Sequence, residues 1–324
     1  MKKNNLFLNF TLLSFLIVIS ASIRAQDPTF TQFYANPVYL NPAFAGADRC
    51  PKITLNYRNE WPNLSGNYVT YCASYDVYSK NIKGGLGLIA MHDQQGQATI
   101  QTTMVGGIYS YNLKVNNKFY IMFGVKASYF QKFLDWDKLT FGDMIDPRRG
   151  FIYQTGDVPR GGRRGFFDAT AGIVGFGKNY YFGVAANHLN RPNESMILGD
   201  SKLPIRLTAH IGSIIPLGKK LNRKSKTTIS PNIIYQYQNG FQELNIGTSV
   251  TFGLFSSGVW YRSNDAFIVN FGIVTDKFKM GYSYDLTVSK LSSVSGGSHE
   301  VSMGIFLPCK VKAKSWSDNP CPKF

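Results

Sequence analysis

Residues 119–130, FYIMFGVKASYF, decide how this sequence folds, because their side chains alternate in character along the chain. One set of alternate positions is apolar, and the other mixes polar, small and apolar residues. Successive side chains of a β-strand point to opposite faces, so this spacing predicts a strand with two unlike faces. The apolar face consists of Phe119, Ile121, Phe123, Val125, Ala127 and Tyr129, and the second face of Tyr120, Met122, Gly124, Lys126, Ser128 and Phe130.

The same alternation recurs in residues 205–212, 243–253 and 300–307, and in each segment the charged residues keep to one face. An apolar face opposite a polar one is typical of strands whose outer surface meets lipid and whose inner surface lines a lumen. Four polar-face residues are candidate lumen residues: Arg206, His210, Glu243 and Asp285. A structural ion-pair network is the simpler interpretation of these four residues, and lining a pore or holding a plug is the functional one.

Extending the pattern along the chain gives about fourteen candidate strands of about ten residues. Most are long enough to cross a bilayer when tilted. The sequence therefore predicts an all-β fold, a transmembrane antiparallel β-barrel of about 14 strands within residues 51–308. The candidate strands are residues 51–59, 67–77, 84–92, 98–113, 118–131, 166–176, 179–188, 203–217, 225–237, 241–253, 256–263, 266–275, 278–287 and 299–308.

The composition of the 324 residues agrees with a barrel. Only 17% are charged, against about 25% in an ordinary soluble domain, while 15% are aromatic and 31 residues are glycine. The 44% hydrophobic content argues against disorder, and no apolar run beyond the N-terminus is long enough for a membrane-spanning helix. A soluble β-sandwich remains the alternative fold, because alternation alone does not show which face meets lipid.

The N-terminus indicates export. Lys2 and Lys3 precede an apolar run and the small-residue stretch that ends at Ala25, so residues 1–25 are predicted to be a cleaved signal peptide. Residues 26–50 contain three prolines and do not alternate, which predicts an irregular lead-in that lies in the periplasm or plugs the barrel. Residues 309–324 follow the last strand as a predicted periplasmic tail. We expect an outer-membrane location with loops at the cell surface.

The connections differ in length at the two predicted ends of the barrel. The predicted periplasmic turns are short, whereas residues 132–165 form one long predicted outer loop, as in bacterial barrels. Five arginines of this loop are candidate partner-binding residues, because a guanidinium pairs with a carboxylate through two hydrogen bonds; the alternative is a solvated loop that touches lipid phosphates. These arginines are Arg148, Arg149, Arg160, Arg163 and Arg164. Nucleic-acid binding is not expected of an exported barrel, despite the net charge of +16.

The four cysteines are candidates for disulfides, because an exported protein folds in an oxidising compartment. A first hairpin centred near Trp61 would place Cys50 opposite Cys72, and Cys309 with Cys321 is then the second predicted pair. Reduced cysteines or swapped pairs remain open, since connectivity cannot be read from sequence. No metal-ligand spacing, nucleophile elbow or phosphate loop is present in the sequence, so we expect no cofactor, no metal and no enzymatic activity.

Two stretches near the N-terminus carry a resemblance to a known family. QDPTFTQFYANPVYLNPAFAG at residues 26–46 and YRNEWP at residues 57–62 closely resemble the start of the PorP/SprF family of type IX secretion system outer-membrane proteins. GGSHEVSMGIF at residues 296–306 resembles the last strand of that family, and the terminal CPKF is similar to the ending of SprF-like members.

The resemblance implies a barrel that supports the secretion or surface anchoring of large adhesins, in some members for gliding motility. The implied partners are the C-terminal region of a secreted adhesin, periplasmic components of the secretion system and outer-membrane lipid. The alternative function is a diffusion channel or a transporter of hydrophobic ligands, which requires an open lumen.

Overall fold

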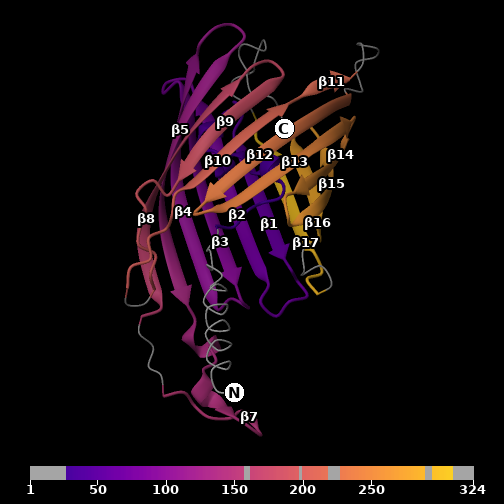
Figure 1. Cartoon of the computed structure of the whole chain (residues 1–324). Helices are drawn as coiled ribbons and strands as arrows, with labels where there is room; N and C mark the ends of the chain where they lie inside the picture. Colours follow the sequence, from indigo (N-terminus) through magenta and orange to yellow (C-terminus); the bar gives the residue numbers. More distant parts are fainter. Residues whose placement is uncertain (1–26, 157–160, 197–198, 218–226, 289–293, 309–324) are drawn as a thin grey trace, which may run out of the picture.

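The computed structural model describes residues 27–156, 161–196, 199–217, 227–288 and 294–308. Within them, long antiparallel strands wind into a barrel (Figure 1). The strands are β1 (Lys52–Glu60), β2 (Tyr68–Ser79), β3 (Gly84–Gln95), β4 (Ile100–Lys114), β5 (Tyr120–Leu134), β8 (Arg163–Phe176), β9 (Tyr180–Asn187), β10 (Arg206–Ser213), β11 (Ile215–Leu217), β12 (Thr227–Gln238), β13 (Phe241–Phe252), β14 (Phe255–Arg262), β15 (Ala266–Val274), β16 (Phe278–Thr287) and β17 (Ser298–Phe306).

Each strand of the wall pairs with the strands before and after it in sequence, and β1 pairs with β17 to join the two ends of the chain. The pairing of β10 with β12 completes the ring. Because β11 continues β10 along the same neighbour β12, the two count as one strand of the wall, and the barrel is a closed one of 14 strands. The predicted fold class and strand number are confirmed, and every predicted strand overlaps an observed one.

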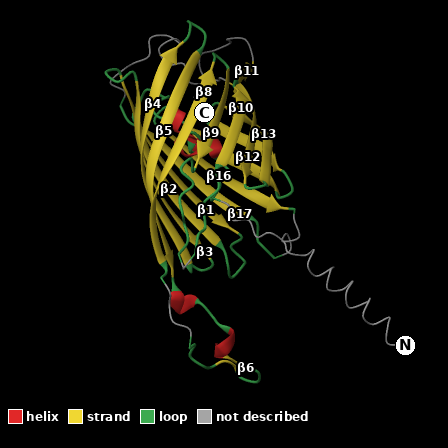
Figure 2. Cartoon of the chain, turned by 60° about the vertical axis from the view of Figure 1, so that its left-hand side comes forward, coloured by secondary structure: helices red, strands yellow, loops and turns green. Residues whose placement is uncertain are grey.

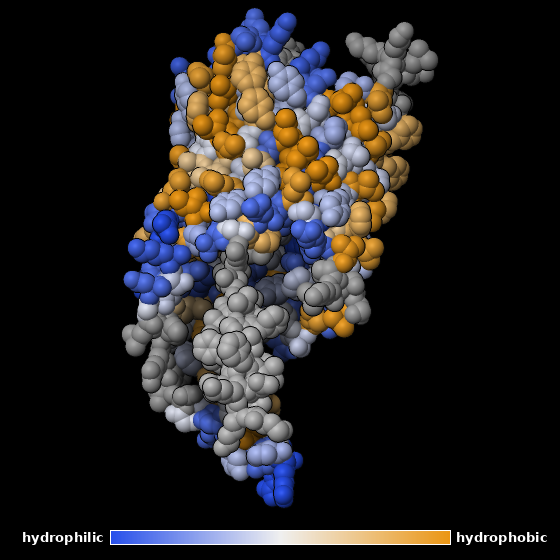
Figure 3. Space-filling view, viewed as in Figure 1, coloured by the Kyte–Doolittle hydropathy of each residue, from blue (hydrophilic) through white to orange (hydrophobic). Residues whose placement is uncertain are grey.

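Residues that alternate in the sequence lie on opposite faces of the barrel wall. Val105 on β4 is 57% exposed on the outside, and its neighbour Met104 is 1% exposed on the inside. Phe123 and Met122 on β5 differ in the same way, with 41% and 0% exposed. Figure 3 shows the apolar residues gathered on the outer wall and hydrophilic ones toward its ends. This apolar outer surface matches the band that meets lipid in membrane barrels.

The two ends of the barrel differ, and we name them by their connections. At the short-turn end, strands are joined by brief turns such as residues 80–83 and 177–179. At the long-loop end, the described residues 135–156 extend beyond the wall (Figures 1 and 2). This loop contains η3 (Trp136–Lys138), η4 (Gly142–Met144) and a small hairpin of β6 (Ile145–Asp146) and β7 (Gly150–Phe151).

Residues 27–50, which we call the lead-in, lie inside the barrel, and none of them is exposed. They form η1 (Phe33–Ala35), α2 (Pro37–Leu40) and η2 (Pro42–Phe44), which Figure 2 shows enclosed by the strands. Pro37 and Pro42 begin their helices, where a missing N–H costs nothing. The side chain of Asn41 caps η2 by accepting a 3.0 Å hydrogen bond from the N–H of Ala43.

Glycines of the wall make room for the lead-in. A side chain on Gly124 of β5 would overlap the backbone of Pro42 and Ala43, and one on Gly172 of β8 would overlap the amide of Asn41. Phe33 packs edge-on against Trp260 of β14, with ring centroids 4.9 Å apart, and Phe44 lies in an apolar cluster with Tyr120 and Phe176. The lumen therefore contains a packed core between the lead-in and the wall.

Candidate functional site

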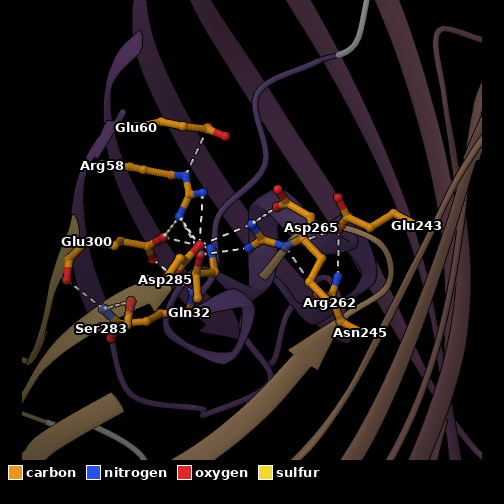
Figure 4. A network of polar contacts seen from close by, with 11 residues as sticks. Gln32, Arg58, Glu60, Glu243, Asn245, Arg262, Asp265, Ser283, Asp285 and Glu300 are labelled. Carbon is orange, nitrogen blue, oxygen red and sulfur yellow. Dashed lines mark hydrogen bonds and ion pairs between the residues drawn. The ribbon is translucent and has the colours of Figure 1, made fainter. Parts of the chain in front are cut away.

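The most extensive contact between lead-in and wall is a buried ionic network, which we call the Arg58 network (Figure 4). The Arg58 guanidinium on β1 lies 3.1 Å from the carboxylate of Asp285 on β16 and 3.5 Å from that of Glu300 on β17. Arg262 on β14 approaches the same Asp285 oxygen at 3.0 Å. All four side chains are at most 4% exposed, so two cations and two carboxylates neutralise one another away from solvent.

The network holds two consecutive residues of the lead-in. The N–H groups of Thr31 and Gln32 donate to the two carboxylate oxygens of Glu300, at 2.6 and 3.0 Å. The hydroxyl of Thr31 donates to Asp285 at 2.7 Å and accepts a hydrogen bond from Arg58. Hydrogen bonds to charged groups are stronger than neutral ones, so these contacts fix the lead-in firmly to β16 and β17.

A second anchor holds the first described residues of the lead-in. Asp27 accepts from Nε2 of His188 at 2.7 Å, and Nδ1 of the same ring lies 2.9 Å from Asp168 on β8. Arg206 lies 3.5 Å from the Asp27 carboxylate, and Gln238 donates to it at 3.3 Å. The imidazole therefore bridges a carboxylate of the lead-in and a carboxylate of the wall.

The charges around His188 determine its protonation. Burial by itself lowers the pKa of His188, but the neighbouring Asp27 and Asp168 outweigh it and raise the pKa to about 9. For Asp27, burial acts to raise the pKa, whereas Arg206 and His188 together lower it well below its usual range. Both groups are therefore charged near neutral pH, and the second anchor is a set of ion pairs.

We expect the second anchor to weaken in alkali. A raised histidine pKa contributes stability that is complete below the unfolded value of 6.5 and is lost as pH rises through about 9. The lowered pKa of Asp27 contributes above 3.8 and is lost in acid. Hydrogen exchange of residues 27–33, corrected for intrinsic rates, should therefore show protection falling by about two orders of magnitude between pH 6 and 10.

The matched control for this prediction is His188→Gln, which keeps a hydrogen-bonding side chain without the titration. In this variant protection should be low and nearly independent of pH. Equal protection of wild-type residues 27–33 at pH 6 and pH 10 would show that the ion pairs of His188 do not hold the lead-in.

Further contacts follow the lead-in toward the short-turn end. The amide of Asn41 donates to the carbonyl oxygens of Ile173 and Val184, at 3.2 and 3.1 Å. The amide of Asn36 donates to the sulfur of Cys72 at 3.2 Å, and the N–H of Gly46 donates to Asp76 at 2.9 Å. The lead-in is thus bonded to the wall along its whole described length.

The four candidate lumen residues all lie inside the barrel, and three of them touch the lead-in. Arg206 pairs with Asp27, and the His210 ring lies 3.3 Å from the Asn41 amide. Asp285 contacts Thr31. Glu243 joins the edge of the Arg58 network by accepting from Asn245 at 2.6 Å and lying 3.9 Å from Arg262. The structure therefore brings Glu243 and Asp285 into one network and places Arg206 and His210 at separate contacts.

The predicted pairing of Cys50 with Cys72 is wrong, because Cys72 is a free, buried thiol. Its partner across the first hairpin is Asn56. The turn of that hairpin is centred near residue 64, not at Trp61, and this shifts the register by six residues. Cys309 and Cys321 lie outside the described residues, as do the tail and the predicted signal peptide.

The candidate arginines lie at the long-loop end but not in one place. Arg148 and Arg149 follow β6, and their N–H groups each donate to Asp146 at 2.8 Å. Arg163 and Arg164 begin β8, where Arg163 lies over the ring of Phe133 and Arg164 donates to the carbonyl oxygen of Asn193. All four are exposed. Arg160 lies outside the described residues.

Sequence reasoning missed three members of the Arg58 network: Arg58 itself, Arg262 and Glu300. A signal for two of them was present, because Arg58 and Glu300 lie in the stretches that resemble the PorP/SprF family, as do Thr31 and Gln32. These stretches lie far apart in sequence and meet at one point in the lumen. Arg58 and Glu300, from the second and third stretches, bind Thr31 and Gln32 of the first stretch, which belongs to the lead-in.

Neither a membrane-spanning helix nor a metal centre is found in the described part of the chain. No described helix is long and apolar enough to cross a membrane. No three described histidine, cysteine or acidic side chains are grouped so that they could hold a metal ion. The charged side chains of the Arg58 network and of the second anchor are instead bonded to one another and to the lead-in.

These observations identify the chain as an outer-membrane β-barrel protein, with a closed barrel of 14 strands, an apolar outer wall and a filled lumen. The chain belongs to the family described as type IX secretion system membrane protein PorP/SprF, whose model matches residues 22–305. The resemblance seen in the sequence is thereby confirmed. Membership implies association with components and cargo of that secretion system, and the family and fold are those of a secretion-system membrane protein.

Solved structures of outer-membrane barrels resemble the chain at low identity. The CymD monoaromatic hydrocarbon channel is 12% identical with a TM-score of 0.46, over 84% of this chain and 93% of that one. A FadL homologue of Pseudomonas aeruginosa is 12% identical with a TM-score of 0.43, over 88% and 95% of the two chains. Omp33 of Acinetobacter baumannii is 10% identical with a TM-score of 0.41, over 80% and 100%. Comparison with curated protein sequences gave no match.

Proposed function

We propose that this protein is a closed platform that holds an exported adhesin at the cell surface and so supports its secretion or anchoring, including adhesins used in gliding motility. The observation that carries the proposal is the filled lumen. The lead-in is bonded to the wall along residues 27–46, so an exported protein does not pass through this barrel. Binding of cargo is therefore assigned to the exposed ends.

The long-loop end is the proposed cell-surface end, since bacterial barrels place short turns in the periplasm and longer loops outside. In this orientation residues 135–156 extend away from the cell, and the predicted signal peptide directs the chain to the outer membrane. The apolar outer wall contacts membrane lipid.

Two arginines of the long loop form no ion pair with the described acids of that loop. Both Asp143 and Asp146 are used inside the loop: Asp143 accepts from the N–H of Gly156 at 2.8 Å, and Asp146 accepts from the N–H groups of Arg148 and Arg149. These backbone hydrogen bonds lower the pKa of both carboxyls. The guanidinium groups of Arg148 and Arg149 form no ion pair within the described residues and face solvent.

The ligand class that suits this surface is the acidic C-terminal region of an exported adhesin. A guanidinium binds a carboxylate through two parallel hydrogen bonds, and Phe151 and Tyr153 beside the arginines are 61% and 53% exposed. Arginine and aromatic residues are enriched in protein interfaces. Arg163 and Arg164 add exposed basic side chains elsewhere at the same end of the barrel.

The short-turn end is proposed to meet periplasmic components of the secretion system. Its turns expose several lysines, namely Lys80, Lys83, Lys114, Lys118 and Lys178. A surface with one sign of charge attracts a partner of the opposite sign and speeds its association. The predicted periplasmic tail, residues 309–324, lies outside the described residues.

We expect the double substitution Arg148→Glu and Arg149→Glu to lower co-purification of the adhesin by about tenfold or more, because like charges across an interface repel. The measurement is quantitative mass spectrometry of proteins recovered with the tagged barrel from membranes at low salt. Lys178→Glu, at the opposite end, is the matched control and should keep wild-type recovery. Undiminished adhesin in the double variant would contradict binding by this loop.

A further inference from the structure

A small cavity lies where the lead-in meets the wall. Its volume is about 50 Å³, enough for one small ion or one or two water molecules. Pro28 and Tyr39 of the lead-in border it, and Lys126, Asn187 and Arg206 line it from β5, β9 and β10. None of the residues that line it belongs to the Arg58 network.

Three hydrogen-bond donors of this cavity lack an acceptor within the described part of the chain. Nε of Arg206 and Nδ2 of Asn187 are buried without a partner. The Lys126 ammonium lies 5.9 Å from the ring centroid of Tyr39 and has no hydrogen bond or ion pair among the described residues. The exposed fractions are 5% for Lys126, 2% for Asn187 and 7% for Arg206.

The orientation of the Asn187 amide supports its role as a donor. Its oxygen accepts from the hydroxyl of Thr170 at 3.2 Å, so its nitrogen is the atom left without a partner. The cavity therefore combines two cationic donors with one neutral donor.

The acids that line the same cavity already have partners. Asp27 is bound by His188 and Gln238, and Glu194 is paired with Lys132. Asp93 accepts from Thr70 at 2.7 Å and from Gln95 at 2.9 Å. A buried cation without a partner carries a large desolvation cost, and none of these three acids forms an ion pair or a hydrogen bond with Lys126 among the described residues.

We propose that this cavity binds a small monovalent anion, a halide or a single carboxylate group, held by Lys126, Asn187 and Arg206. The anion accepts from all three donors and neutralises Lys126. Because Tyr39 and Pro28 border the same space, the bound anion also seals the lead-in against the wall. A carboxylate there comes either from a free small acid or from a polypeptide that reaches into the lumen.

Anomalous scattering from crystals of the full barrel soaked in bromide tests the site. We expect a bromide peak between Nζ of Lys126 and Nε of Arg206 in the wild type. Lys126→Met keeps the length of the side chain but loses its charge, and it should lose the peak. Lys118→Met, at an exposed turn, is the matched control and should retain it. A wild-type cavity that contains only water, with no peak, overturns the proposal.

Stability in solution provides a second readout. Above the dissociation constant, each tenfold rise in chloride should raise the folded-to-unfolded ratio about tenfold in the wild type, but not in Lys126→Met. If Lys126→Met is more stable than the wild type in every salt, Lys126 is an unpaired buried charge and the proposal fails.

Competition separates the two sources of ligand. Displacement of bromide by formate supports a site that also accepts a carboxylate, and a peak that persists in formate restricts the site to halides. Displacement by an acidic peptide as well as by formate supports a carboxylate from a polypeptide, whereas displacement by formate alone supports a free small acid.

Discussion

Removing residues 27–44 of the lead-in is expected to turn a silent barrel into a conducting pore. A barrel of 14 strands encloses a lumen too wide for its own wall side chains to fill, and here the lead-in occupies it. In planar bilayers the wild-type protein should show no step-like currents, and the deletion variant should show them at about ten times the background frequency or more. The result distinguishes a closed platform from a diffusion channel.

A second variant keeps this test decisive if the deletion variant does not fold. Gly124→Leu places a side chain where the backbone of Pro42 and Ala43 now lies, so it should displace the lead-in and produce intermittent currents. Gly107→Leu is the matched control, because nothing lies within 4 Å of a Cβ at that position. Steady currents through the wild-type barrel would contradict a closed lumen and favour a channel.

Replacing Arg58 by methionine should destabilise the barrel by about 3–5 kcal/mol, which is typical when one partner of a buried ion pair is lost. The substitution removes the cation between Asp285 and Glu300 and leaves both carboxylates in a region from which water is excluded. The same change frees Thr31, which Arg58 now contacts. Unfolding in denaturant, followed by tryptophan fluorescence of the purified protein, measures the effect.

Two comparisons separate the network from a general loss of packing. Lys178→Met removes an exposed cation from a turn and should change stability by less than about 0.5 kcal/mol. The double variant Arg58→Met with Glu300→Met should be less destabilised than the sum of its single changes, by about 1 kcal/mol or more. Additive effects would mean that Arg58 and Glu300 do not act as one unit.

The fold was predictable because the wall obeys one simple rule. Each strand has lipid on one side and the lumen on the other, so the alternation seen at residues 119–130 continues wherever the wall does. The same rule placed Arg206, His210, Glu243 and Asp285 on polar faces, and each side chain lies inside the barrel. Their partners were not predictable from spacing, since Asp285 meets Arg58 across 227 residues of sequence.

Two features could not be predicted from alternation. The lead-in has three prolines and short helices, so its contacts depend on the cavity it fills and not on its own periodicity. The register of the first hairpin depends on the turn at residues 61–67, and placing its centre at Trp61 instead of residue 64 led to the wrong partner for Cys72. Turn geometry sets the register of a hairpin, and sequence alone did not specify that geometry here.

Photo-crosslinking from the long loop in living cells tests the central claim most directly. A photoreactive residue replaces Arg149, and a second strain carries it in place of Lys178 at the short-turn end. If the barrel is a platform for exported cargo, mass spectrometry should find peptides from the C-terminal region of an exported adhesin linked at position 149 and not at position 178. Crosslinks at position 149 to lipid alone, or adhesin peptides linked only at position 178, would contradict the account.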